Sequence, residues 1–529
     1  MQYPFRHKQT YVLNLSNNPI RQVFTRSLFI PSKLFLELFL ELFSKLSTKL
    51  FSKIPLALAP LLLLPYSLES QALSATTSER IHGTAPYLTI DGGTTKLTTT
   101  DDLLSIKLWD GRTFTPQNNP SSPTALIELP NAWGTFADIE MIVPPLSDSI
   151  NINDLVTQGN WGDDDGDGQG AGEVTASGSI SLAITDKDGN TINRSDALDI
   201  CNAPYKVTLS STGGNLATQY GLPDSSTFSG GTAEYYITPP SPPVICSVRP
   251  NLLLGGTTGL DWDDPRFAGP ANIWDPAKGF LVQSTNPSFY DLNFPTTGAD
   301  GLFFDLDIGG IYASQLSWTV NTSGSINATV SWRLPNQGDK WITDKSKYVT
   351  RVTLHGPRAS SSQISSSNPG QITVPSLPQR FELVGRDSSG NEVRYGFELR
   401  QWFVHRADKR FSVSEQAAWC RSLGYHLSRV NEVTNAVCSG VGVNPAFPCT
   451  GAVGATPPSS GNHYQRQIGA GLFTEWGYMN NYADAGFLYF DHWTSDAIGG
   501  DKHFAVNSND GYVDSNKDFL DRYGICTTP

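Results

Sequence analysis

The stretch FSVSEQAAWCRSLGYHLSRVNEV (residues 411–433) carries the clearest helix signals of the chain. Ser412 followed by Glu415 is the pattern of a capping box, in which each side chain bonds the backbone of the other residue. Cys420 falls on the apolar face of the helix that follows, and a second short helix is expected before residue 433. The stretch therefore predicts a helical element whose buried cysteine pairs with a distant one, and the last cysteine, Cys526, is the candidate.

The rest of the chain has the composition of a mainly β protein. Of its 529 residues only 16% are charged, whereas 48 are Gly and 35 are Pro. This mixture favours short strands joined by tight turns over helix bundles, and the length predicts about two to four domains. The net charge is −13, and because the first 53 residues are basic, the remainder is more acidic still. Such a surface repels nucleic acid and anionic lipid, which excludes both as partners.

The six cysteines are even in number and show neither a CxxC pair nor a zinc-like spacing with histidine. These features favour disulfides over metal ligation and indicate an oxidising compartment. Six cysteines allow many pairings. Grouping them by neighbourhood favours three pairs: Cys201 with Cys246, Cys438 with Cys449, and Cys420 with Cys526.

The N-terminal residues 1–72 have the features of a leader. A basic segment ends at Lys53, and a short apolar run interrupted by prolines follows it. Ser70-Gln71-Ala72 then forms a small-x-small cleavage site, which predicts an exported protein cut after Ala72. The alternative is an uncleaved anchor, although the prolines make this run a poor spanning helix.

Residues 73–378 read as a β-rich region of one or two sub-domains. SISLAITDKDGNTI (179–192) is a strand, a turn and a second strand, and further β-prone runs include YKVTLSST, LFFDLDI and YVTRVTLHG. No fixed repeat is evident, so we expect β-sandwich units with irregular insertions. The Ser/Pro/Gly-rich residues 359–378 are the best candidate for a linker to residues 379–529.

An acidic turn, DDDGDGQG, follows Trp161 in this region. Asp163, Asp165 and Asp167 occupy the first three ligand positions of a calcium loop, but its last position holds Val174 instead of the required Glu. We therefore interpret the turn as a solvated acidic loop, with a structural calcium site as the alternative. No other cofactor is expected.

Residues 379–529 combine the helical stretch with aromatic, glycine-punctuated strands, which predicts an α+β module. The segments FSVSEQAAWCRSLGYHL, GAGLFTEWG, HWTSD, HFAVNSNDG and GIC resemble the C-type lectin-like module that ends intimin- and invasin-type adhesins of enterobacteria. Upstream, NWGDDDGDGQG, NRSDALDICNAPYKVTLSS, FPTTGADGLFFDLDIGG and SLPQRFELVGRDSSGN resemble the adhesion domain that precedes this module. The resemblance covers roughly residues 85–529 and specifies the family more closely than the ligand.

The resemblance implies a protein displayed on the bacterial cell surface or outer membrane, or secreted, whose last module binds a protein or glycan of the host cell. It also implies an outer-membrane anchor or translocator, which would be encoded separately. Calcium-dependent sugar-binding lectins use Glu-Pro-Asn or Gln-Pro-Asp together with Trp-Asn-Asp, and none of these tripeptides occurs here. We therefore expect recognition through aromatic and polar surface without calcium.

The residues that we expect at this contact surface are aromatic side chains next to amides and a carboxylate. They are Trp476, Tyr478, Asn480, Asn481, Tyr482, Asn509 and Asp510. The alternative is that tryptophans of the module belong to its core, and for Trp476 the two readings are balanced. No nucleophile elbow, Walker loop or dinucleotide fingerprint is present, so we expect no catalysis. A secreted carbohydrate-active enzyme and a purely structural stalk are the alternative functions.

Overall fold

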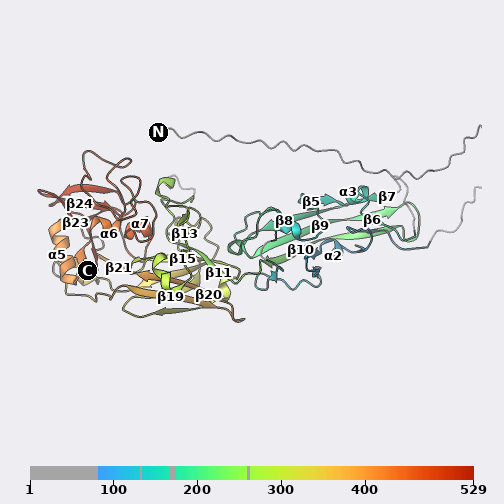
Figure 1. Cartoon of the computed structure of the whole chain (residues 1–529), viewed down its shortest axis with the longest axis horizontal. Coiled ribbons are helices and arrows are strands. Elements are labelled where there is room, and N and C mark those ends of the chain that lie inside the picture. The colour runs from blue at the N-terminus through green and yellow to red at the C-terminus, as the bar shows by residue number, and fades with distance from the viewer. Residues whose placement is uncertain (1–81, 132–133, 166–173, 259–262, 529) are drawn as a thin grey trace, which may run out of the picture. The chain divides into compact units, whose positions relative to one another are not determined.

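The computed structural model describes residues 82–131, 134–165, 174–258 and 263–528 (Figure 1). Strands dominate this part of the chain, and the longest helix in it is α5 (Val413–Leu423). The mainly β fold that the composition predicts is therefore confirmed. The predicted leader, residues 1–72, lies outside the described residues.

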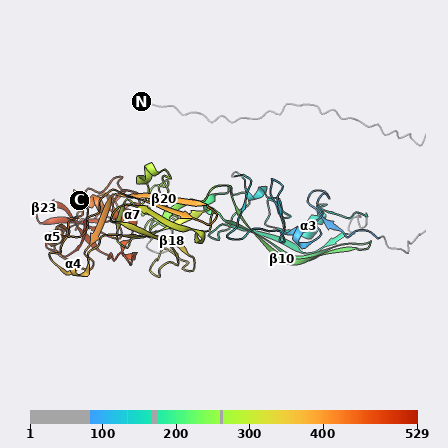
Figure 2. The same cartoon turned by 90° about the horizontal axis from the view of Figure 1, so that it is seen from below.

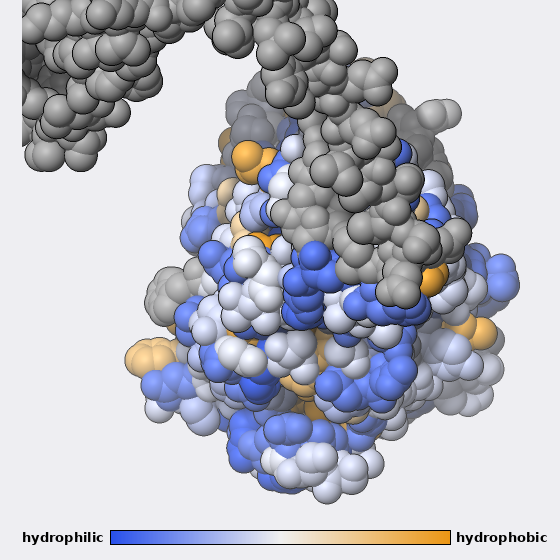
Figure 3. Space-filling model, turned by 90° about the vertical axis from the view of Figure 1, so that its right-hand side faces the viewer, coloured by the Kyte–Doolittle hydropathy of each residue, from blue (hydrophilic) through white to orange (hydrophobic). Residues whose placement is uncertain are grey.

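The first region is organised around one large sheet in the order β4-β10-β9-β8-β5, with β7 paired to β9. Its strands are β4 (Ile127–Glu128), β5 (Ser149–Asn151), β7 (Val174–Ala176), β8 (Ser179–Thr185), β9 (Tyr205–Thr218) and β10 (Ser225–Thr238). Along β8, buried and exposed side chains alternate, so only one face of the sheet is apolar. The face of the molecule in Figure 3 is accordingly mainly hydrophilic, with hydrophobic residues in small separate groups.

Irregular segments cover the apolar face of this sheet. They contain the short elements β1 (Tyr87–Leu88), α2 (Thr100–Leu103), β2 (Ile106–Lys107), β3 (Thr113–Phe114), η2 (Phe136–Asp138), α3 (Ile152–Thr157), β6 (Trp161–Gly162) and η3 (Ile200–Asn202). Leu103, Phe136 and Ile139 of these segments are buried in one hydrophobic cluster with Val207 and Tyr235 of the sheet. The first core is thus a single covered sheet rather than two facing sheets.

The second region begins with two facing sheets. The larger has the order β12-β13-β11-β15-β18-β17, and the smaller has the order β16-β19-β20. Their strands are β11 (Val244–Arg249), β12 (Trp274–Asp275), β13 (Gly279–Leu281), β15 (Phe303–Gly309), β16 (Ser317–Thr322), β17 (Asn327–Arg333), β18 (Val349–His355), β19 (Gln379–Arg386) and β20 (Glu392–Leu399). Phe304 of one sheet packs edge-on against Phe397 of the other, with ring centroids 5.9 Å apart. Three 3-10 turns connect these strands: η4 (Pro265–Phe267), η5 (Pro287–Leu292) and η6 (Ala313–Gln315).

The C-terminal module adds a seven-stranded sheet and the short helices. The strands are β14 (Thr297–Ala299), β21 (Gln401–His405), β22 (His426–Leu427), β23 (Asp491–Gly499), β24 (Lys502–Asn507), β25 (Val513–Lys517) and β26 (Tyr523–Thr527). The remaining helices are α6 (Val430–Val433), α7 (Leu472–Trp476) and η7 (Met479–Asn481). Strand β14 pairs in parallel with β21, so a segment from far upstream in the chain belongs to the sheet of this module.

One hydrophobic cluster runs through the whole second region, from Ile245 to Cys526. The predicted linker, residues 359–378, contains α4 (Ser361–Ser365) and lies against α5 (Figure 2). Trp419 of α5 donates from its ring nitrogen to the carbonyl oxygen of Gln363 at 2.9 Å. The predicted division between residues 378 and 379 therefore falls inside this cluster, and separate folding of residues 379–529 stays a prediction.

The six cysteines form the three disulfides Cys201–Cys246, Cys420–Cys526 and Cys438–Cys449, which are the pairs favoured by the sequence. The first of these joins the two regions, because Cys201 lies in η3, between β8 and β9 of the first region, and Cys246 lies in β11. Lys187 of the first region also forms an ion pair with Asp307 of β15 at this junction.

Candidate binding surface

Helix α5 anchors the C-terminal module as the sequence predicts. The backbone N–H of Glu415 donates to the Ser412 hydroxyl at 3.4 Å, and the N–H of Ser412 donates to the Glu415 carboxylate at 3.1 Å. Both cysteines of the disulfide that ties Cys420 to Cys526 are fully buried. The capping-box prediction is thus confirmed, and the helix forms part of the interior rather than of a ligand site.

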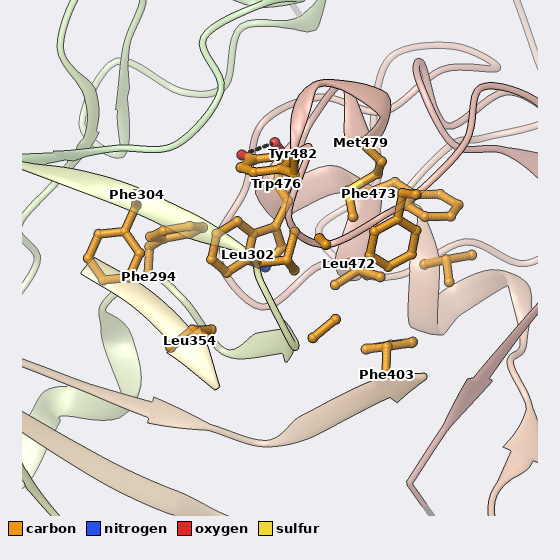
Figure 4. Packing of buried hydrophobic residues seen from close by; sticks show 14 of the residues in the cluster. Phe294, Leu302, Phe304, Leu354, Phe403, Leu472, Phe473, Trp476, Met479 and Tyr482 are labelled. Atoms are coloured by element: carbon orange, nitrogen blue, oxygen red, sulfur yellow. Dashed lines mark hydrogen bonds between the residues drawn. The ribbon is translucent and has the colours of Figure 1, made fainter. Parts of the chain in front are cut away.

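Two aromatic residues predicted for the contact surface, Trp476 and Tyr482, are in the core. Trp476 is the last residue of α7. Figure 4 shows it beside Leu302, between Phe294 on one side and Leu472 and Phe473 of the same helix on the other. Trp476 donates from its indole nitrogen to a backbone carbonyl of β14 at 3.0 Å, and its own carbonyl accepts from the Tyr482 hydroxyl at 2.8 Å. Of the two readings left open for Trp476, the core reading holds, whereas the expectation that Tyr482 is exposed is wrong, because upstream segments cover the surface that the module alone would present.

The other predicted contact residues divide between the interior and the surface. Asn481 and Asn509 are buried, whereas Tyr478 and Asp510 are half-buried and Asn480 is exposed. Burial raises the pKa of Asp510 to about 6. These residues therefore do not form a continuous exposed patch, and their role in binding stays a prediction.

Buried polar side chains explain why this part of the module is covered. The carboxylate of Glu475 accepts hydrogen bonds from the backbone and hydroxyl groups of Thr296 and Thr297 and from the N–H of Gly469. Arg466 is fully buried, and its guanidinium donates to four backbone carbonyls, three of them between residues 251 and 254. The sequence did not point to these contacts between the module and the upstream segments, because an Arg that hydrogen-bonds only backbone carbonyls has no charged partner in the sequence to mark it.

An exposed apolar loop of the module lies outside the contact residues that the sequence predicted. Residues 439–447 are all exposed, and Val441, Val443 and Phe447 keep 55%, 41% and 46% of their surface accessible. A signal was present in the sequence: no Asp, Glu, Lys or Arg occurs between Glu432 and Arg466. We call residues 439–447 the apolar loop.

The apolar loop is tied to the rest of the module at several points despite its exposure. The disulfide Cys438–Cys449 closes it across 11 residues. The N–H of Asn462 donates to the carbonyl of Val441 at 2.8 Å, and its amide side chain donates to Gly442 of the loop and to Val513 of β25. Because these bonds restrain the backbone, binding through the loop would lose less conformational entropy than binding through an untied segment.

Acidic residues lie on the sheet to which the apolar loop is tied. Burial and the nearby charge of Asp491 together raise the pKa of Asp514 to about 7. Burial also raises the pKa of Asp491 itself. An apolar loop next to carboxylates suits an uncharged apolar recess on a protein better than an anionic membrane surface.

The predicted calcium turn is only partly within the described residues. Asp163 is buried, and Asp165 accepts a hydrogen bond from the N–H of Thr84 at 3.1 Å, but Asp167 lies outside the described residues. In the part of the chain that the structure describes, no group of three or more His, Cys, Asp or Glu side chains could hold a metal ion. A structural calcium at this turn therefore stays a prediction.

A search of the described helices finds none that is both long and apolar enough to cross a lipid bilayer. No protein-family model matches the chain, and no curated protein matches it.

Solved structures similar to this chain include those of invasin and intimin. One is invasin, a bacterial integrin-binding protein, with 12% sequence identity and a TM-score of 0.31, over 68% of this chain and 52% of that one. Another is a C-terminal 282-residue fragment of intimin in complex with the intimin-binding domain of the translocated intimin receptor, with 13% identity and a TM-score of 0.29, over 67% of this chain and 86% of that one. A mutant intimin of EHEC O157:H7 aligns with 13% identity and a TM-score of 0.24, over 48% of this chain and 92% of that one. The chain thus spans about half of the length of the invasin structure.

Proposed function

We propose that the chain is an exported bacterial surface adhesin, similar to invasin and intimin, that binds a host-cell receptor through its C-terminal module without catalysis. The observation that carries the proposal is the apolar loop: Val441, Val443 and Phe447 are exposed on a backbone fixed by the Cys438–Cys449 disulfide. Contiguous exposed apolar side chains on a soluble protein mark sites that contact a partner.

The sequence segments that resemble adhesins support the same proposal from a separate direction. On this proposal, residues 379–529 are the receptor-binding module, residues 73–378 are the adhesion region that presents it, and residues 1–72 are the export signal. Display at the outer membrane or release into the medium both agree with this organisation. The receptor would be a host-cell protein, since the loop offers apolar contacts and few polar groups to a sugar.

Binding of the full chain to cultured epithelial cells tests the proposal. We expect saturable binding that the variant Phe447→Ser weakens by about tenfold or more, because interface centres depend on a few buried aromatic residues. The matched control is Phe519→Ser, which changes an equally apolar residue that is 67% exposed elsewhere in the module. Wild-type protein that binds no host cell would contradict the adhesin function.

The alternatives predict different results in the same assay. A carbohydrate-active enzyme would convert glycans without saturable cell binding. A structural stalk would neither bind cells nor convert glycans. Equal loss of binding in Phe447→Ser and Phe519→Ser would show that binding does not use the apolar loop.

A further inference from the structure

The larger sheet of the second region ends in a strand whose outer edge is unpaired. Strand β17 comes last in the order β12-β13-β11-β15-β18-β17 and is paired on one side only, with β18. Strand β16, which precedes it in the chain, has the same position in the smaller sheet and lies beside β17. One side of this pair of sheets is therefore formed by two edge strands.

The pairing of β18 fixes which backbone groups of β17 point outward. The N–H of Leu354 in β18 donates to the carbonyl of Leu302, on the side of β15, at 2.9 Å. Because the backbone groups of successive residues in a strand alternate in direction, the odd-numbered residues of β18 bond β17. They are paired with the odd-numbered residues of β17. The N–H and C=O groups of Ala328, Val330 and Trp332 therefore point to the free edge.

In the described part of the chain, these outward groups have almost no partners. The N–H of Ala328 donates to the side-chain oxygen of Asn327 at 2.8 Å. The carbonyl of Ala328 and both backbone groups of Val330 and Trp332 are bonded to no other segment. The edge thus offers donors and acceptors in the pattern that another extended strand requires.

Other edge strands of the molecule are closed by side chains. On the part of β10 that β4 does not reach, the N–H of Tyr236 donates to the Ser121 hydroxyl at 3.0 Å. On β25, the Asn462 side chain donates to the carbonyl of Val513 at 2.8 Å and accepts from its N–H at 3.1 Å. Because closed edges prevent pairing between molecules, the open edge of β17 differs from them in what it can bind.

The sequence of the two edge strands lacks the residues that usually protect an edge. Between Asp307 and Arg333 there is no Asp, Glu, Lys or Arg, and no Pro. The registers of β16 with β19 and of β17 with β18 are also continuous, without a bulge. Charged side chains, prolines and bulges are the common means by which proteins prevent edge-to-edge pairing. Strand β17 is therefore suited to pair with another strand.

A second copy of the chain fits this edge better than an unrelated strand. The chain carries a net charge of −13, so two copies repel each other wherever their carboxylates face each other. The uncharged edge avoids this repulsion, whereas a partner of opposite charge would be bound through charged residues. Antiparallel pairing centred on Val330 also places the large Trp332 opposite the small Ala328 of the second copy.

We propose that two copies of the chain pair through the free edges of β17 and form a symmetric dimer. Val330 of each copy donates to the carbonyl of Val330 in the other, and Trp332 of each donates to the carbonyl of Ala328. The larger sheets of the two copies then continue into one another. This edge is separate from the apolar loop, so the dimer does not depend on the function proposed for that loop.

The neighbouring register is less suitable for the dimer. Centring the pair on Thr329 would place Trp332 opposite Ile326 of the second copy. The N–H and C=O of Ile326 are already bonded by the side chain of Gln379 in β19, so Trp332 would lose its backbone partners. The register centred on Val330 pairs all three outward residues.

Sedimentation velocity of the full chain over a range of micromolar concentrations tests the proposal. We expect a reversible equilibrium between monomer and dimer, because one strand pair buries less area than a permanent interface. The double variant Thr329→Lys/Ser331→Lys should weaken the dimer by about tenfold or more, since like charges then lie directly opposite each other. Both residues are exposed, so the variant should fold, and circular dichroism checks this.

Two further variants show whether the register is the one proposed. Thr329 of one copy faces Ser331 of the other, so Thr329→Lys/Ser331→Glu brings opposite charges together and should restore the dimer. The control Ser225→Lys/Thr227→Lys introduces the same two lysines at exposed positions of β10 in the first region. It should leave the dimer unchanged.

Three results would overturn the proposal. The first is a monomer at every concentration, which would leave the edge to an extended segment of a different protein. The second is a dimer that Thr329→Lys/Ser331→Lys leaves intact, or that the control on β10 weakens equally. The third is equal weakening by the like-charged and the oppositely charged variants of β17, because pairing centred on Val330 requires them to differ.

Discussion

The two regions of the molecule stabilise their cores by different means. The first core is one sheet whose apolar face is covered by irregular segments, and among the described residues its buried cation, Arg194, bonds backbone carbonyls and no carboxylate. The second core encloses ionised groups: Arg351 of β18 is 1% exposed and forms ion pairs with Asp305 and Asp339, both of which are also buried. Glu475 is fully buried nearby in the same core region.

This difference shows where long-range contacts decide the structure. An apolar face can be covered by many sequences, whereas a buried ion needs partners at defined distances. Arg351, Asp305 and Asp339 belong to the sheets and the loop that precede the C-terminal module. The module itself is fixed to the upstream segments by buried Glu475, which bonds Thr296 and Thr297, and by buried Arg466, which bonds carbonyls of residues 251–254.

Replacing Arg351, the cation of the cluster with Asp305 and Asp339, should lower the stability of the second region more than any other change considered below. Arg351 donates to both oxygens of Asp305 at 2.8 and 2.9 Å, so Arg351→Met leaves two buried carboxylates without their counter-ion. We expect the second region to lose about 4 kcal/mol of unfolding free energy. Calorimetry of the full chain should show this loss in one transition and leave the transition of the first region in place.

The control is the buried cation of the first region, Arg194. Its guanidinium donates only to backbone carbonyls, of Ile139, Val143 and Pro144, so Arg194→Met strands no buried charge. A smaller loss, confined to the transition of the first region, is expected. If both transitions moved together in either variant, the two regions would be a single cooperative unit and the contrast between them would not hold.

The sequence predicted the features that depend on local pattern. The capping box at Ser412, the six-cysteine grouping and the mainly β class all follow from short-range spacing or composition. The burial of Trp476 and Tyr482 did not, because it depends on β14 entering the sheet of the module from far upstream. The contacts among Tyr312, Trp332 and Tyr348 were equally hidden in the sequence, since these rings meet only when the sheet forms.

Because of the ionisation of Asp514, the two regions should differ in how their folding stability depends on pH. Burial and the nearby Asp491 raise its pKa from 3.8 to about 7 in the folded protein. Between about pH 4 and pH 7 the folded state therefore keeps a proton that the unfolded chain has lost, so stability falls as the pH rises and stays low above pH 7. Asp514→Asn removes this penalty, and we expect the second region to gain about 2 kcal/mol over wild type at pH 8.

The difference between variant and wild type should disappear as the pH falls towards 4. Buried His405 and His492 act in the opposite direction, because burial lowers their pKa to about 4 and about 3 and acid then favours the unfolded chain. They are present in both proteins, so their contribution cancels in the comparison. Thermal melts across this pH range measure the effect, with Asp188→Asn on an exposed turn of the first region as control. A gain that is the same at every pH would show that packing, not ionisation, is responsible.

The smallest effect is expected from the helix caps, which occur in both regions. Thr99 caps α2, a single turn of four residues, and Ser412 caps α5, which has 11 residues and carries the buried Cys420. Ser412→Ala removes the acceptor for the N–H of Glu415 and should cost the second region about 1 kcal/mol. Thr99→Ala should cost the first region less, because a helix of one turn can fray without exposing its single buried residue, Leu103. Unfolding in denaturant measures both losses, and a larger loss from Thr99→Ala would mean that the disulfide and burial, rather than the cap, hold α5 in place.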